Sequence, residues 1–153
     1  MSRPIPEDMP LVEPGVAWPR FFWAPMIALN FWAGKNLHPA EINFGMQARG
    51  TYKMPPDFTT LDELYLVMRP EWTGNYNLSI TISFGKVGEL YNVHTQNVAG
   101  LVALVLDTIR CYDLVPVFPA LLALLETGDH LMVNVNNQTA QDLHVYGLDG
   151  RYS

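Results

Sequence analysis

Residues 128–152 read GDHLMVNVNNQTAQDLHVYGLDGRY and contain two alternating segments around one polar loop. In the first segment Leu131, Val133 and Val135 face one way, and the side chains between them face the other. This is the period of a half-buried strand. Residues 143–147 continue the pattern after the loop. We therefore expect an antiparallel hairpin that completes a β-sandwich.

Upstream segments predict further short strands. The clearest is residues 77–84, NLSITISF, which places Leu78, Ile80, Ile82 and Phe84 on one face. Strands are also expected at residues 46–53, 64–69 and 90–94, whereas residues 101–110 fit either a strand or a helix. Residues 118–126 predict a short helix, with Pro119 in its first turn. The fold class predicted for residues 26–153 is all-β, a jelly-roll-like antiparallel β-sandwich with one short helix.

Residues 1–25 predict an extended N-terminal arm. Six of the 12 prolines fall in this range, spaced so that neither a helix nor a central strand persists. The segment is nevertheless rich in apolar side chains that need cover from water. An arm of this kind either lies across a neighbouring subunit or wraps its own domain, and the sequence leaves both open. Its expected interface residues are Trp18, Phe21, Phe22 and Trp23.

Composition restricts the partners. Hydrophobic residues make up 49% of the chain and charged residues 16%, against about 25% charged in an average soluble domain. Some apolar surface is therefore expected to contact partner subunits. A net charge of -6 with no Lys/Arg cluster argues against nucleic acid. Charges and prolines interrupt residues 101–125, so no membrane span is expected, and the N-terminus lacks the pattern of an export signal.

The sequence contains no constellation that indicates catalysis. Of the four histidines, His130 and His144 are the best pair for a metal, since we expect them on facing strands of the last hairpin. A metal site needs further ligands, and none can be assigned to that pair. We therefore predict no catalytic residues, no metal and no cofactor. A metal-dependent sandwich enzyme ranks last among three hypotheses.

Loop residues suggest a glycan-binding alternative. Aromatic and amide side chains that stack on and hydrogen-bond to sugars occur in two predicted turns. The candidate ligand residues are Trp72, Asn75, Tyr76, Asn137 and Gln138. A carbohydrate-binding module, or the receptor-binding tip of a tail fibre, is the second hypothesis.

Residues 62–72 (DELYLVMRPEW), the alternating strand 77–84, residues 128–135 and residues 143–152 together carry a family resemblance. Over about residues 50–152 the chain resembles the jelly-roll virion structural proteins of tailed bacteriophages, of the trimeric capsid-decoration or fibre type. The resemblance implies a non-enzymatic homotrimer that contacts major capsid or tail proteins. It also implies a protein made in the host cytoplasm and located in the virion. This is the first hypothesis.

Overall fold

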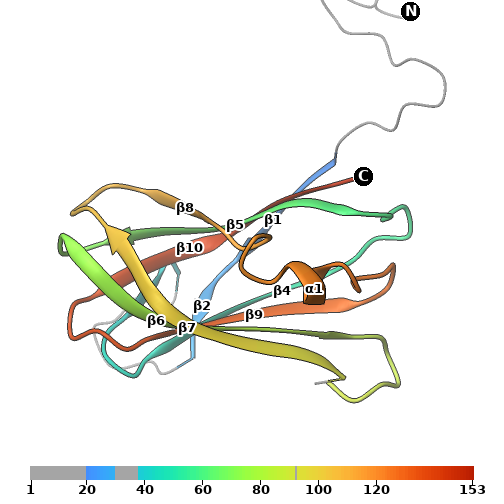
Figure 1. Cartoon of the computed structure of the whole chain (residues 1–153), viewed down its shortest axis with the longest axis horizontal. Coiled ribbons are helices and arrows are strands. Elements are labelled where there is room, and N and C mark those ends of the chain that lie inside the picture. Colours follow the sequence, from blue (N-terminus) through green and yellow to red (C-terminus); the bar gives the residue numbers. More distant parts are fainter. Residues whose placement is uncertain (1–19, 30–37, 92) are drawn as a thin grey trace, which may run out of the picture.

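Two antiparallel β-sheets pack face to face in the chain, as Figure 1 shows. The structure is a computed structural model that describes residues 20–29, 38–91 and 93–153. One short helix, α1 (Pro119–Leu122), lies at one end of the sandwich. The predicted all-β sandwich with a single short helix is therefore confirmed over the described residues. Among those residues, no helix has the length and apolar character needed to cross a membrane.

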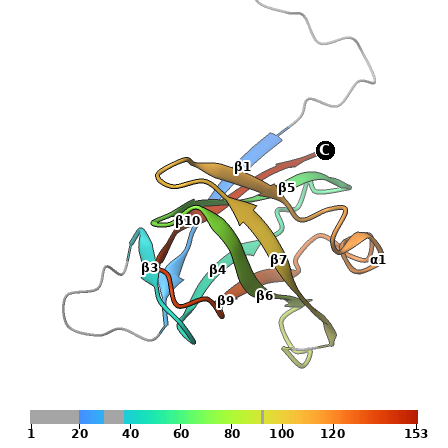
Figure 2. The same cartoon turned by 60° about the vertical axis from the view of Figure 1, so that its left-hand side comes forward.

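The first sheet is built around the last strand of the chain. Its order is β1 (Arg20–Pro25), β10 (Leu143–Tyr152), β5 (Leu61–Pro70) and β8 (Arg110–Asp113). The short strand β3 (Ala40–Ile42) also pairs with β10. Strand β10 thus pairs with three strands from separate parts of the chain, among them the earliest described strand, and Figure 2 shows the arrangement from a second direction.

The second sheet has the order β2 (Ile27–Ala28), β4 (Gln47–Lys53), β9 (His130–Asn137), β6 (Gly74–Gly85) and β7 (His94–Leu104). Strands β6 and β7 form the longest hairpin of the fold, paired from Gly74 opposite Leu104 to Phe84 opposite His94. Strands β1 and β2 are separated by Met26 alone, so this segment passes from one sheet directly to the other.

The core fills the space between the sheets with alternate side chains from each strand. The predicted inward residues of β6 and β9 are all buried, including Ile82 and Val133. The first sheet contributes Leu64, Leu66 and Met68 from β5. Period-two alternation therefore identified both inner faces correctly at these strands, because apolar burial provides most of the favourable free energy of folding.

The predicted terminal hairpin is wrong. Strand β9 lies in the second sheet and β10 in the first, so residues 138–142 cross between the sheets. Asn137 supports this crossing, because its side-chain amide donates to the carbonyls of Ile42 and Gln141, at 3.0 and 2.8 Å. The alternation of two strands is the same whether they pair with each other or face each other across a core, so the pattern did not distinguish the two arrangements.

In the middle of the chain, the structure differs from the prediction at three segments. Residues 90, 91 and 93 lie outside any strand, and the strand begins only at His94. The ambiguous range 101–110 contains the end of β7, a turn and the first residue of β8, with no helix. The short helix predicted over 118–126 is confirmed, but it is shorter than predicted and ends at Leu122.

The predicted arm contains the first strand of the sandwich. Residues 20–25 form β1, paired with β10 from Arg20 opposite Tyr152 to Pro25 opposite Gly147. Phe22 is buried and stacks on Tyr52 with ring centroids 4.1 Å apart. Gly150 on β10 leaves room for this ring, since a Cβ atom there would overlap Phe22. The domain therefore begins earlier than the predicted residue 26, and Pro25 is tolerated because β1 is an edge strand.

Candidate functional site

Strand β7 is an unprotected sheet edge. Within the described residues it pairs with β6 on one side and with no strand on the other. Its sequence, HTQNVAGLVAL, contains no Lys, Arg, Asp, Glu or Pro. Residues 95–97 and 99–101 are exposed although they alternate between the two faces of the strand. A long edge that presents unpaired backbone groups and no charge is a template for pairing with another chain.

The other sheet edges carry features that discourage pairing. Strand β8 has only four residues, with charged Arg110 and Asp113 at its ends. Strand β1 contains Arg20 and Pro25, and β2 is two residues long. Short length, charge and proline are the usual protections of edge strands. Strand β3, which pairs only with β10 among the described strands, has three residues and includes Glu41, so β7 is the described edge strand that combines length with an uncharged sequence.

An apolar surface, here called the end patch, continues from the C-terminal end of β7. It consists of Trp72, Val105, Leu106 and Ile109, whose side chains are between 41% and 61% exposed. The Leu106 N–H donates to Thr73 Oγ1 at 2.9 Å, and the Asp107 N–H to the Pro70 carbonyl at 3.1 Å. These bonds hold the β7–β8 loop against the β5–β6 turn, at the left-hand end of Figure 1. Exposed apolar clusters of this kind mark interaction sites.

A second apolar surface lies on the opposite side of the sandwich, along β1 and β2. Phe21, Trp23, Ile27 and Leu29 are exposed there, Phe21 to 71%. Phe22 points inward between its two exposed neighbours, so of the predicted arm anchors only Phe21 and Trp23 are available to a partner among the described residues. The prediction for Trp18 lies outside the described residues.

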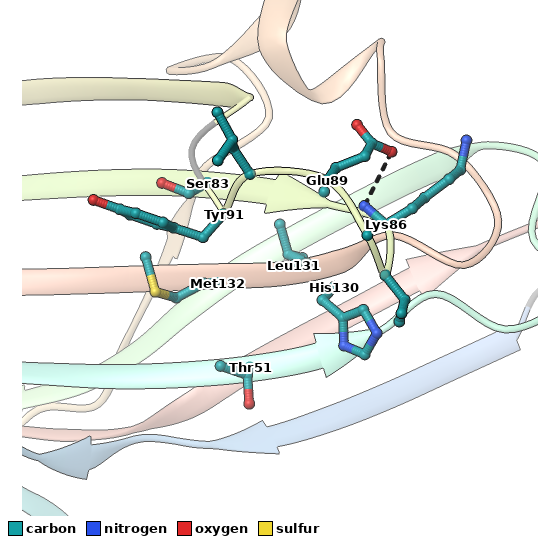
Figure 3. A pocket seen from close by; sticks show the side chains of 12 residues that line it. Thr51, Ser83, Lys86, Glu89, Tyr91, His130, Leu131 and Met132 are labelled. Carbon is teal, nitrogen blue, oxygen red and sulfur yellow. Dashed lines mark hydrogen bonds between the residues drawn. The ribbon is translucent and has the colours of Figure 1, made fainter.

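A hollow of about 390 Å³ lies where residues 86–91 fold over the outer face of the second sheet, and Figure 3 shows it from close by. The Glu89 N–H donates to the Lys86 carbonyl at 3.0 Å, and the Lys86 N–H to Glu89 Oε1 at 3.2 Å, which closes the turn. The side chains that line the hollow include Thr51, Ser83, Lys86, Tyr91, His130 and Met132. Its volume lies at the lower end of the range for small-molecule sites.

The hollow combines polar groups with one exposed aromatic ring. Tyr91 is 80% exposed, and Figure 3 shows its ring beside Ser83 and Met132. Lys86 also forms an ion pair with Glu126; the hydrogen bond to that carboxylate raises the pKa of Lys86 and lowers the pKa of Glu126. Both groups stay charged at neutral pH. The arrangement fits a small polar ligand, such as one sugar ring, that stacks on tyrosine.

The predicted ligand loops are only partly accessible. Tyr76 is fully buried, its hydroxyl donates to the Asp142 carbonyl at 2.8 Å, and burial raises its pKa above the ordinary value. Asn137 is equally buried and supports the crossing between the sheets. Neither is available to a glycan. Trp72, Asn75 and Gln138 are exposed, but Trp72 covers Gly74 and belongs to the end patch.

His130 and His144, which the sequence offered as the best histidine pair for a metal, are separated by the topology, since the two residues lie in different sheets. His130 is exposed beside the hollow. His144 is buried in the first sheet, where its ligand atom and those of Glu41 and Glu71 all lie within 4.8 Å of one another. No local signal identified these carboxylates, because they are 103 and 73 residues from His144 in sequence.

Comparison with known proteins gives no family. No protein-family model and no curated protein sequence matches the chain. Among solved structures, TmCBM61 in complex with beta-1,4-galactotriose has a TM-score of 0.40 and 10% identity, over 88% of this chain and 87% of that chain. A family two carbohydrate esterase from Cellvibrio japonicus has a TM-score of 0.40 and 9% identity, over 89% of this chain.

The T13 particle of IBDV, infectious bursal disease virus, contains a chain with a TM-score of 0.37 and 15% identity, over 94% of this chain. The present chain spans 34% of the length of the esterase and 35% of the viral chain. These likenesses concern the β-sandwich alone.

Proposed function

We propose that this chain is a non-enzymatic virion structural protein, a trimeric capsid-decoration or fibre subunit that assembles through the β7 edge. The observation that supports the proposal best is the 11-residue, uncharged and unpaired strand β7. We base the virion part of this proposal on the sequence resemblance of about residues 50–152 to phage jelly-roll proteins. Its partners would be other copies of the chain and the major capsid or tail proteins.

Backbone chemistry favours a strand as the partner of β7. An edge strand presents alternating N–H and C=O groups, and a second strand satisfies them in register. Ala99 and Gly100 at the middle of β7 are small, so a neighbouring backbone meets little steric resistance there. The end patch then adds apolar area next to the paired strands. Burial of apolar surface contributes about 25 cal/mol per Å².

The positions of the two apolar surfaces favour a ring of subunits. The β7 edge lies at one end of the strand order in the second sheet and β2 at the other. If the β7 side of one subunit meets the exposed apolar side chains along β1 and β2 of the next, by packing and not by pairing with those protected edge strands, the contact is heterologous and closes into a ring when the rotation allows it. A homotrimer is the smallest such ring. The exposed residues Phe21 and Trp23 would lie in each boundary.

Native mass tests the assembly directly. Light scattering coupled to size exclusion, over a concentration series, is expected to give three times the chain mass of 17.3 kDa. A self-complementary pairing of β7 with β7 would give twice that mass instead, because a two-fold contact closes at two subunits. A chain that remains monomeric at the highest concentration would contradict the assembly proposal.

A second candidate function is glycan binding in the hollow at residues 86–91. The observation in its favour is the exposed Tyr91 ring beside Ser83 and His130. For a glycan bound there, Tyr91→Ala should weaken affinity about tenfold, since the loss of one stacking contact costs on the order of 1.4 kcal/mol. Trp72→Ala, at the opposite end of the sandwich, is the matched control and should leave affinity unchanged.

The glycan experiment begins with an array of neutral oligosaccharides and continues with titration calorimetry on any ligand found. Binding that responds to Trp72→Ala and not to Tyr91→Ala would move the site to the end patch. Absence of binding at millimolar glycan would remove this candidate.

A further inference from the structure

Two cations flank the hollow at residues 86–91 on strand β4. Thr51, which lines the hollow, alternates with Arg49 and Lys53, so all three side chains lie on the outer face of the second sheet and are exposed. Lys53 is directly opposite His130 on β9, another residue that lines the hollow. Figure 3 shows Thr51 and His130 on neighbouring strands, away from the Glu89 carboxylate. Arg49 and Lys53 are here called the β4 cations.

The β4 cations have no partner within the described part of the chain. Neither side chain forms an ion pair or a hydrogen bond there. By contrast, an ion pair with a carboxylate holds each of Arg20, Arg69, Lys86 and Arg151. In a chain with a net charge of -6, two uncompensated cations beside a hollow attract an anionic ligand to it.

The second sheet contributes no carboxylate to this face. Its described strands β2, β4, β9, β6 and β7 contain no Asp or Glu, whereas β3, β5, β8 and β10 of the first sheet each contain at least one. Opposite Arg49 lies Asn134, and Thr81 and Asn97 continue the same row of paired residues. Such amides and hydroxyls donate and accept hydrogen bonds, as sugar hydroxyls do. The face therefore combines positive charge with neutral hydrogen-bonding groups.

The carboxylates near the hollow lie on its loop side. Glu89 lines the hollow, and its Oε1 atom accepts the Lys86 N–H at 3.2 Å. Glu126 pairs with the Lys86 ammonium. Asp129 is buried, and its carboxylate accepts the Glu126 N–H at 2.7 Å. The negative charges are therefore grouped around Lys86, and the β4 side of the hollow is left positive.

One sugar can contact Tyr91 and a β4 cation at the same time. The Tyr91 ring lies beside Met132 in Figure 3, and Lys53 is one strand and two residues away from Met132. Strands lie about 4.8 Å apart and rise about 3.4 Å per residue, so the Cα atoms of Met132 and Lys53 are roughly 8 Å apart. Arg49 has the same offset on the other side of Thr51. A ring that stacks on Tyr91 thus brings a charged substituent within reach of either cation.

We propose that the hollow and the β4 cations together bind an anionic sugar, one that bears a carboxylate or a sulfate group. Tyr91 stacks on the ring, and Arg49 or Lys53 donates charge-assisted hydrogen bonds to the anion. Two cations are too few for nucleic acid, which is bound by larger clusters of Lys and Arg. This inference rests on the second candidate function, glycan binding in the hollow, and names the class of glycan. It does not depend on assembly through β7.

A glycan array with uronic-acid, sialylated and sulfated oligosaccharides, each beside its uncharged parent, tests the class of ligand. We expect the full chain to bind at least one anionic member about tenfold more tightly than its parent, and the array shows whether a carboxylate or a sulfate carries the charge. Titration calorimetry then compares that pair of sugars on the double variant Arg49→Gln, Lys53→Gln. The anionic sugar should bind at least about tenfold more weakly to the variant, while the affinity for the parent should not change.

The matched control for each single variant is Arg110→Gln, which removes an exposed cation from β8 in the first sheet and should leave both affinities unchanged. Equal loss in Arg110→Gln would assign the effect to net charge and overturn the inference. All these side chains are exposed, so circular dichroism should show the wild-type fold in every variant.

The remaining outcomes separate this inference from the function on which it rests. If both sugars bind equally, Tyr91→Ala weakens both and the double variant weakens neither, the glycan site stands and the β4 cations have no part in it. If the anionic sugar depends on the β4 cations but not on Tyr91, the ligand lies outside the hollow and the assignment is wrong. If the chain binds no sugar of either kind, the candidate function fails together with this inference.

Discussion

Deletion of residues 1–25 is expected to unfold the sandwich, whereas deletion of residues 1–19 is expected to leave its thermal midpoint nearly unchanged. The longer deletion removes β1, and with it the six-residue pairing to β10. It also removes the buried Phe22 ring. Loss of a buried Phe side chain alone costs about 3–5 kcal/mol, which approaches the ~5–15 kcal/mol total stability of an ordinary domain.

The shorter deletion ends just before the first described residue of the strand. Arg20 is then retained, and its Nε atom pairs with Asp57 Oδ2 at 2.7 Å. Thermal unfolding followed by circular dichroism distinguishes the two chains. An unfolded 20–153 chain would show that residues 1–19 belong to the folding unit, and a stable 26–153 chain would contradict the role of β1.

A point-mutant pair tests the same feature with less change. Phe22→Ala should destabilise the chain by about 3–5 kcal/mol, while Phe21→Ala, which truncates an adjacent ring that is 71% exposed, should change stability by about 0.5 kcal/mol or less. The pair is matched because both residues lie on β1 and lose the same atoms. Equal effects would show that Phe22 does not anchor β1 to the core.

Replacement of Ala99 and Leu101 by lysine is expected to abolish self-association and to leave the fold intact. Both side chains are exposed on β7, Leu101 to 69%. In the monomer they meet solvent. In the assembly, two uncompensated lysines at a paired edge cost several kcal/mol, so association should weaken by at least about 100-fold, since each 1.4 kcal/mol is a factor of ten.

The matched control is Val87→Lys with Leu124→Lys. These residues are also exposed and apolar, at 86% and 53%, and the change adds the same charge at positions outside β7 and the end patch. Analytical ultracentrifugation of both double variants separates a local effect from the effect of net charge. If the control dissociates as readily as the β7 variant, charge alone controls assembly. If the β7 variant keeps the wild-type mass, the interface lies elsewhere.

The strands were predictable where burial was one-sided. Residues 77–84 and 130–136 alternate because each strand has one face in the core, and the period of apolar side chains follows that geometry directly. Which strands pair with one another was harder to predict from the sequence. A local pattern predicts which face of a strand is buried, but it does not predict which strand lies beside it. The crossing at residues 138–142 was therefore predicted as a hairpin.

For the candidate surfaces, too, the sequence showed the composition of each segment but not its position in the fold. The uncharged run from Val93 to Leu106 is visible in the sequence, but only the sheet order makes it an edge. Phe22 could not be separated from Phe21 until β1 was placed beside β10. The proximity of Glu41, Glu71 and His144 depends on long-range topology altogether, and the sequence could not show that His130 and His144 lie in different sheets.

The central place of β10 in the first sheet has a consequence for synthesis. Strands β1, β3 and β5 all pair with residues 143–152, which leave the ribosome after every other described strand. The first sheet therefore cannot assemble before residues 143–152 have been made, and β1 must wait for more than a hundred further residues. Such non-local pairing makes folding slow. Until β10 is made, the nascent chain keeps the apolar face of the second sheet uncovered, and transiently exposed apolar surface of this kind is prone to aggregation.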